Sequence, residues 1–299
     1  MKIATVVTPL LVLLQFQPEE VLSQQKETLF QVSDFTKEGL FTSGIEGPAV
    51  DAEGNLYAVN FEREGTVGKV LQDGTVLLFV ELPAGSIGNS ICFARNGDMR
   101  IADYSKHSIL KVDMKTKHII VYAHDSSMNQ PNDICIAKNN TLYASDPRWA
   151  DGTGNLWMIN NDGRTVLLED SMGTTNGIEI SPDEKYLYVN ESVQRNVWKY
   201  DIAGDGTISN KRLLIQFTDG GMDGMKCDRD GNLYIARYGK GNIAVVSPDG
   251  KILREIALSG NMPTNITFGG SDGTTCYVTM QDRGCIETFQ AVIPGKKWK

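Results

Sequence analysis

The stretch IEGPAVDAEGNLYAVN, residues 45–60, is the first clear copy of a phrase that recurs along the chain. In each copy a polar residue opens the phrase, an apolar run follows, a turn rich in Asp, Asn and Gly comes next, and a second apolar run closes it. The opening residues are Glu46, Asn89, Asn132, Asn176, Asp223 and Asn265, spaced 42 to 47 residues apart. A period of this length, holding about four short strands, is typical of a β-propeller blade. The sequence therefore predicts an all-β protein, a six-bladed β-propeller with a central channel.

The last repeat is shorter than the others. After Asn265 it contains only three apolar runs, at residues 264–268, 276–280 and 285–291. A blade that ended there would leave an unpaired outer edge, which favours aggregation. We therefore expect an N-terminal strand near residues 29–35, where apolar residues alternate, to close the last blade. Residues 24–299 then form a single propeller domain.

The N-terminus reads as a separate leader. A basic start, Met1-Lys2, precedes an apolar stretch at residues 3–14 that is too short to span a bilayer and has the length of a secretory signal core. The sequence predicts a signal peptide over residues 1–23, and hence a secreted or periplasmic protein. If this stretch is instead a loosely packed leader, the expected location is the cytoplasm.

Composition excludes several classes of partner and site. The net charge of −8 comes without a basic stripe, which argues against nucleic-acid binding. No other apolar stretch is long enough for a membrane helix, and nothing indicates an oligomeric state. The five cysteines lack the CxxC spacing of a zinc or redox site, and we expect them to be buried. The three histidines lie close together at residues 107–124, so any metal must be held mostly by oxygen atoms.

The opening residues are candidate metal ligands. In a propeller the innermost strand of each blade lines the channel, so side chains that begin these strands meet at one mouth. Carboxylates from Glu46 and Asp223, with amide oxygens from Asn132 and Asn176, form a hard-oxygen set that suits Ca²⁺, with Mg²⁺, Mn²⁺ or Zn²⁺ as alternatives. The loops that follow the second strands return to the same end of the channel, and we expect Arg148, Trp149 and Arg283 there.

Six short motifs carry a resemblance to a known family. They occur in order from about residue 45 to 290 and include Glu46-Gly47-Pro48, Pro131-Asn132-Asp133, Ser145-Asp146-Pro147, Thr175-Asn176-Gly177-Ile178, Met222-Asp223-Gly224-Met225 and Pro263-Thr264-Asn265. The ordered set resembles the senescence-marker-protein/gluconolactonase/luciferin-regenerating-enzyme family of six-bladed propellers, to which diisopropylfluorophosphatase is more distantly similar.

The resemblance implies a divalent cation held by Glu46, Asn176 and Asp223, with Asn132 contacting the metal or the substrate. Two departures are informative. Members that act on sugar lactones can carry an Arg where this chain has Gln130, and the phosphatase-like members place a His in the last blade, where residues 263–270 contain none.

The implied reaction is the metal-dependent hydrolysis of a lactone, a small-molecule cyclic ester. The cation polarises the carbonyl group and water attacks it. Asp223 is the best candidate for the catalytic base, and Asp133 or Asp146 are alternatives. The side chains expected to contact the substrate are Asn132, Asp133, Asp146 and Arg148. Two other functions stay open at this point: a phosphotriesterase-type hydrolase that uses the same ring, and a ligand-binding propeller without catalysis.

Overall fold

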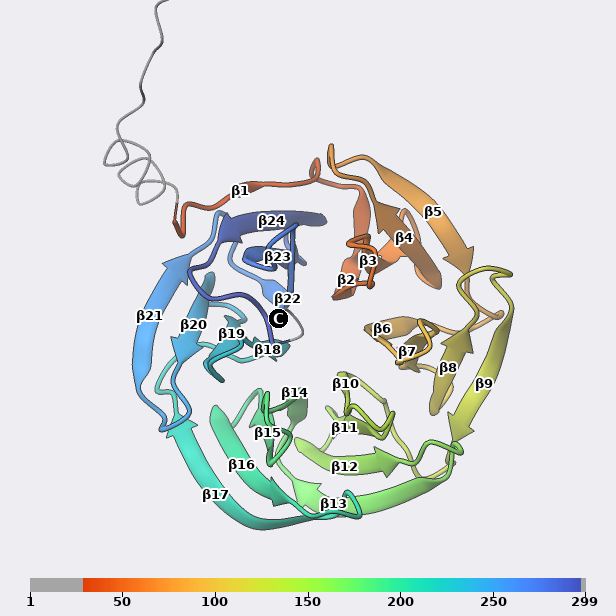
Figure 1. Ribbon diagram of the computed structural model, residues 1–299, viewed down its shortest axis with the longest axis vertical. Coiled ribbons are helices and arrows are strands. Elements are labelled where there is room, and N and C mark those ends of the chain that lie inside the picture. The colour runs from red at the N-terminus through yellow and green to blue at the C-terminus, as the bar shows by residue number, and fades with distance from the viewer. Residues whose placement is uncertain (1–28, 297–299) are drawn as a thin grey trace, which may run out of the picture.

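The computed structural model describes residues 29–296, and the predicted leader over residues 1–23 lies outside this range. Six four-stranded antiparallel sheets are arranged around a central axis, as Figure 1 shows. The described residues contain strands and turns, and no helix among them is long and apolar enough to cross a bilayer. The predicted six-bladed β-propeller is confirmed.

Each blade contributes one strand to the channel and three strands outward from it. The innermost strands, in blade order, are β2 (Phe41–Val50), β6 (Gly88–Phe93), β10 (Ile134–Ile136), β14 (Thr175–Ile180), β18 (Met225–Cys227) and β22 (Pro263–Gly269). The second strands are β3 (Leu56–Phe61), β7 (Met99–Asp103), β11 (Leu142–Arg148), β15 (Tyr186–Glu191), β19 (Leu233–Arg237) and β23 (Thr275–Met280). The third strands are β4 (Thr66–Val70), β8 (Ser108–Val112), β12 (Thr153–Ile159), β16 (Asn196–Ile202), β20 (Asn242–Val246) and β24 (Cys285–Gln290). The outermost strands are β5 (Val76–Glu81), β9 (Ile119–His124), β13 (Thr165–Met172), β17 (Ile208–Gln216), β21 (Ile252–Ala257) and, in blade six, β1 (Ser33–Asp34).

The hydrophobic core lies between neighbouring blades. Every residue of β3 and β19 is buried, whereas β21 is mostly exposed, because the inner strands are covered on both faces and the outermost strands on one. One cluster joins Ala236 and Ile243 of blade five to Ile266 and Val278 of blade six. Burial of apolar surface between blades therefore holds the ring together.

The acidic turn of the repeated phrase has a definite structural role. Asp51 Oδ1 accepts hydrogen bonds from the backbone N–H groups of Glu53 and Asn55, both at 2.9 Å. Asp228 makes the same pair of contacts in blade five, to Asp230 at 2.9 Å and Asn232 at 2.8 Å. The Asp therefore closes the turn between the innermost and second strands, as Asp side chains commonly do.

Blade six is completed from two distant parts of the chain. β1 pairs antiparallel with β24, with Ser33 opposite Thr288 (Figure 1). Arg283 joins the two segments: its Nη1 lies 2.6 Å from Asp34 Oδ1 and 2.6 Å from Glu287 Oε1, and its Nη2 lies 2.5 Å from Glu38 Oε1. Arg283 was expected in a loop at the ligand-binding end of the channel. Its guanidinium group instead pairs with carboxylates of the N-terminal segment and of β24, and so stabilises the closure of the ring.

Residues 294–296 form a strap across one end of the channel. Arg229 N donates to Pro294 O at 2.8 Å, and Lys296 N donates to Cys227 O at 3.1 Å. The strap reaches from blade six to blade four, because Gly295 N donates to Gly273 O at 3.0 Å and Lys296 Nζ donates to Ile180 O at 2.8 Å. Above it lies a cavity of about 460 Å³. We call this end the lower end of the channel. The opposite end, at which the opening residues of the six repeats lie, is called the upper mouth.

Candidate active site at the upper mouth of the channel

Backbone irregularities bring the opening residues into the channel. The antiparallel register of the inner strand shifts between Glu46 and Ala49 in β2, and between Thr175 and Ile178 in β14. β6 and β22 have equivalent shifts near Asn89 and Asn265. An extra residue in one strand re-aims the side chains beside it, and such bulges are frequent next to active sites.

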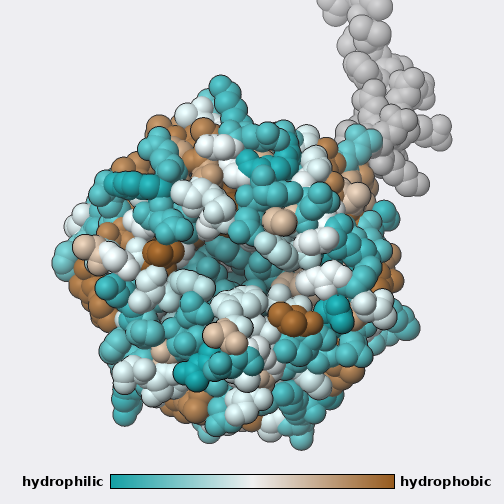
Figure 2. Space-filling model, turned by 180° about the vertical axis from the view of Figure 1, so that it is seen from behind, coloured by the Kyte–Doolittle hydropathy of each residue, from teal (hydrophilic) through white to brown (hydrophobic). Residues whose placement is uncertain are grey.

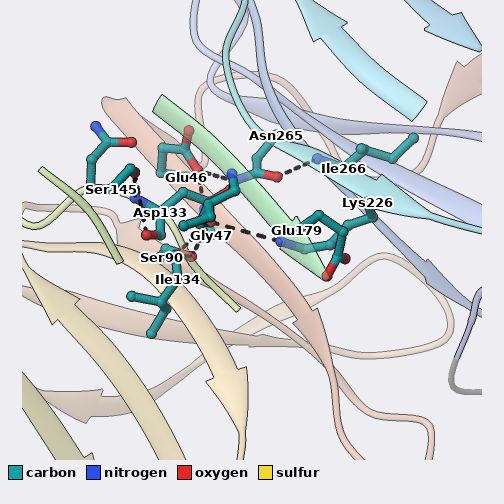
Figure 3. A network of polar contacts seen from close by, with 12 residues as sticks. Glu46, Gly47, Ser90, Asp133, Ile134, Ser145, Glu179, Lys226, Asn265 and Ile266 are labelled. Atoms are coloured by element: carbon teal, nitrogen blue, oxygen red, sulfur yellow. Dashed lines mark hydrogen bonds and ion pairs between the residues drawn. The ribbon is translucent and has the colours of Figure 1, made fainter. Parts of the chain in front are cut away.

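Glu46 and Asp223 are brought together although they come from blades one and five. Glu46 is buried, and its Oε2 accepts hydrogen bonds from Gly47 N at 2.5 Å and Asn265 Nδ2 at 3.0 Å (Figure 3). Burial raises the pKa of Glu46, and the charge of Asp133 raises it further. Loss of solvent around its carboxylate and the charge of Glu46 raise the pKa of Asp223. The residue as a whole is partly exposed. Two carboxylates that oppose each other's ionisation are stabilised by a cation between them.

Asn132 and Asn176 supply the amide oxygens. Both side chains are buried, and neither Oδ1 atom has a hydrogen-bond partner among residues 29–296. Leaving a buried acceptor unsatisfied costs about 1–3 kcal/mol. No three His, Cys, Asp or Glu side chains cluster as metal ligands within that range, so a cation here needs these amide oxygens. The donor set of two carboxylates and two orphaned amide oxygens fits a hard divalent cation.

Glycines let the inner strands of adjacent blades approach each other beside the ring. A Cβ atom on Gly224 would lie 1.9 Å from Cγ of Asn265, the residue that donates to Glu46. Gly47 has a φ of +56°, and a Cβ atom there would lie 2.6 Å from Asn89 O. Glu46, Asn176 and Asp223 are each followed by a glycine in the sequence, a signal that sequence reasoning did not use.

Gly224→Ala is therefore expected to lower the free energy of unfolding by about 1–3 kcal/mol, because overpacking displaces the Asn265 side chain. The matched control is Gly204→Ala, since a Cβ atom at Gly204 would meet nothing within 4 Å. Thermal unfolding of both variants measures the difference. Equal melting temperatures for the two variants would contradict the close packing described here.

Asp133 lies beneath the ring rather than at a surface open to substrate. Its side chain is fully buried and accepts a hydrogen bond from Ser90 Oγ at 2.5 Å. Lys226 Nζ lies 3.8 Å from its Oδ1 atom (Figure 3). This predicted substrate-binding residue therefore supports the ring from below.

Asp146 is also fully buried and anchors a loop. Its Oδ1 accepts hydrogen bonds from Asn129 N at 2.9 Å and Gln130 N at 2.5 Å, and its Oδ2 accepts one from Trp157 Nε1 at 2.9 Å. With both oxygens occupied by donors, Asp146 positions Gln130 and does not itself line the pocket beside the ring.

Arg148 does line that pocket. A cavity of about 420 Å³ lies beside the loop that leads to Asn132, and Gln130, two residues before Asn132, lines it. Its lining consists of Tyr104, Ser105, His107, Asn129, Gln130, Arg148, Trp149 and Ala150. Arg148 is exposed and forms a 3.5 Å ion pair with Asp151, which contributes little to stability. The structure thus joins the predicted loop residues of blades two and three in one pocket.

Figure 2 views the face opposite to that of Figure 1 and shows a hydrophilic hollow at its centre.

Two further residues hold the segment that carries Asp223: Asn190 was missed from the sequence, whereas Arg237 was expected in a loop around the ligand. Asn190 Nδ2 donates to the backbone oxygen of Asp223 at 2.6 Å. Arg237 is fully buried, stacks 3.7 Å from the ring centre of Phe217, and its Nε donates to Gly221 O at 3.2 Å. A signal for Asn190 does exist, because the phrase closes on Asn in both the first and fourth copies, at Asn60 and Asn190.

Several known proteins are similar to this chain over most of its length. Gluconolactonase of Zymomonas mobilis is 28% identical over 271 residues, covering 78% of this chain and 75% of the relative. Diisopropyl-fluorophosphatase of Loligo vulgaris is 27% identical over 300 residues, covering 88% and 94%. Among solved structures, a calcium-binding protein, regucalcin, from Agrobacterium tumefaciens superimposes with a TM-score of 0.75 at 21% identity, covering 90% of this chain and 94% of that one. This last likeness shows the fold alone. Residues 91–282 match the family model described as SMP-30/gluconolactonase/LRE-like region, and the chain therefore belongs to that family.

Proposed function

We propose that this protein is a divalent-metal-dependent lactonase that hydrolyses cyclic esters at the upper mouth of the channel. The observation that carries the proposal is that Asp223 lies against both Glu46 and Asn176, while the buried amide oxygens of Asn132 and Asn176 have no partner among residues 29–296. The relative from Zymomonas mobilis, named gluconolactonase, supports a lactone as the substrate class.

Glu46, Asn176 and Asp223 would hold the cation, and Asn132 would contact either the cation or the substrate. Carboxylate and amide oxygens favour Ca²⁺, and Mg²⁺, Mn²⁺ and Zn²⁺ are the alternatives. When bound, a divalent cation polarises the carbonyl group of the ester as a Lewis acid.

The chain's own residues divide the remaining work. Asp223 is partly exposed, so its carboxylate can accept a proton from the attacking water molecule. Asn265 and Gly47 orient Glu46 as a ligand through their hydrogen bonds. Gln130, Arg148 and Trp149 line the adjoining cavity, which receives the substituents of the lactone.

A second candidate function is phosphotriester hydrolysis at the same ring. It is favoured by the similarity to diisopropyl-fluorophosphatase, which extends over 88% of this chain. Both reactions need electrostatic stabilisation of an oxygen that gains negative charge, so the ring alone does not separate them.

The deciding experiment measures bound metal and the hydrolysis of sugar, aliphatic and aryl lactones and of a fluorophosphate triester, with and without a chelator. The expected result is chelator-sensitive opening of at least one lactone, with activity restored by added Ca²⁺ or another divalent cation. Lactone hydrolysis that survives complete metal removal would overturn the metal dependence. A protein that binds metal and hydrolyses nothing in the panel would instead be a ligand-binding propeller.

A further inference from the structure

Below the ring, the channel contains charged side chains of alternating sign, which are buried or half-buried. From the ring downward they are Asp133, Lys226, Glu179 and Lys296, contributed by blades three, five and four and by the strap. Lys226 Nζ lies 3.8 Å from Asp133 Oδ1 (Figure 3). Lys296 Nζ pairs with Glu179 and donates to Ile180 O at 2.8 Å. We call these four residues the charge ladder. The proposed reaction uses none of them.

Each charged group of the ladder has a neighbour of opposite charge, Lys226 beside Asp133 and Lys296 beside Glu179. Although burial opposes its charge, Asp133 and Glu179 raise the pKa of Lys226 above its usual value. Burial likewise opposes ionisation of Glu179, but Lys296 and Lys226 hold the pKa of that carboxyl below its usual value. With both ion pairs formed, Lys226 with Asp133 and Lys296 with Glu179, the two positive charges of the ladder balance its two negative charges.

The top of the ladder is attached directly to the ring. Asp133 follows Asn132 in the chain, and its Oδ2 accepts a 3.4 Å hydrogen bond from the N–H of Ile178, two residues after Asn176. Asp133 thus lies close enough to the ring for its charge to act on whatever the ring binds.

We propose that Lys226 is a positioning residue that sets the cation affinity of the ring by cancelling the charge of Asp133. The inference rests on the proposed function, because it requires the ring to bind a divalent cation. With each charge of the ladder paired, the ring retains the two negative charges of Glu46 and Asp223, which one divalent cation neutralises. Without Lys226, the ring and Asp133 together would present three negative charges and bind the cation more tightly.

The test is a double-mutant cycle read out by calorimetric titration of the chelator-stripped protein with Ca²⁺ and, separately, with Mn²⁺. Lys226→Met is expected to tighten cation binding by about tenfold or more, because it exposes the ring to the uncompensated charge of Asp133. Asp133→Asn is expected to weaken binding by a similar factor, because it leaves the ammonium group of Lys226 unpaired. The double variant is expected to bind close to the parent affinity.

Two further variants separate charge from packing. Lys226→Arg keeps the charge and is expected to stay near the parent affinity. Lys296→Met removes the more distant positive charge and is expected to tighten binding by a smaller factor than Lys226→Met. Circular dichroism and melting temperature verify that each variant is folded. If Lys226→Met does not fold, Lys226→Gln replaces it, because its amide can still donate to Asp133.

The outcomes distinguish this inference from the function on which it rests. Opposite changes that cancel in the double variant support it. Weaker binding in both single variants would mean that the pair is only structural and would overturn it, while leaving the metal-dependent function intact. A parent protein that binds neither cation would overturn both.

Discussion

Asp223→Asn is expected to lower lactone hydrolysis by about 10³-fold or more, the largest catalytic effect of any single substitution in this chain. The change removes a ligand charge from the ring, and Lewis-acid stabilisation is worth several kcal/mol. It also removes the proposed proton acceptor, whose contribution is typically 10²–10⁴-fold. At low cation concentration, Glu46→Gln is expected to lower lactone hydrolysis by a similar factor, since this substitution also removes one negative charge from the ring.

Saturating Ca²⁺ separates the two roles. Under that condition Glu46→Gln is expected to regain part of its activity, because Glu46 serves only as a ligand, whereas Asp223→Asn is expected to stay inactive. The comparison is made from kcat at several Ca²⁺ concentrations. Glu53→Gln is the control, as Glu53 is an exposed carboxylate in the turn of the same blade. Equal recovery of both ring variants would show that Asp223 is not the base.

Arg283→Ala is expected to lower the free energy of unfolding by about 3 kcal/mol, because it leaves the fully buried carboxylate of Glu287 without its charged partner. The same substitution releases Asp34 and Glu38, which tie β1 to blade six. For a domain of this size, the expected fall in melting temperature is roughly 6–12 °C. Differential scanning calorimetry measures it.

Arg63→Ala provides the matched control. Arg63 also pairs with a glutamate, Glu81, at 2.5 Å, but 54% and 60% of these two side chains are exposed. An exposed pair of this kind contributes about 0–1 kcal/mol, so the melting temperature is expected to change little. If both arginine variants lost the same stability, the ring closure would not depend on the buried pair.

The repeat and the ring were predictable from the sequence because both depend on local patterns. Alternating apolar runs with Asp and Gly turns specify blades, and the position of Glu46, Asn132, Asn176 and Asp223 at the start of their repeats predicts that they meet at one mouth. The motifs around these residues carried the family assignment, which the comparison with known proteins confirms. The metal, its ligands and the catalytic base stay predictions.

The charge ladder and the ring closure were not predictable, because they depend on three-dimensional contacts between distant segments. Lys226 follows Asp223 by three residues and reads as an ordinary strand residue. Its direction into the channel depends on where the short strand β18 begins. The strap at residues 294–296 is held mainly by backbone hydrogen bonds, which leave no pattern in the sequence. Arg283 was expected in a loop near the mouth because its partners, Asp34 and Glu38, are distant from it in the sequence.

The way in which blade six is assembled has a consequence for folding kinetics. Blades one to five are built from consecutive hairpins, whereas the contact between Arg283 and Asp34 joins residues 249 positions apart. Local hairpins form quickly, and pairing of remote segments is slow because the intervening chain must first be ordered. The pairing of β1 with β24 should therefore be the last step of folding and the first to be lost. In native-state hydrogen exchange, the amides of β1 and β24 should open at a lower free energy than those of the inner strands. Unfolding of the ring should therefore begin where β1 pairs with β24.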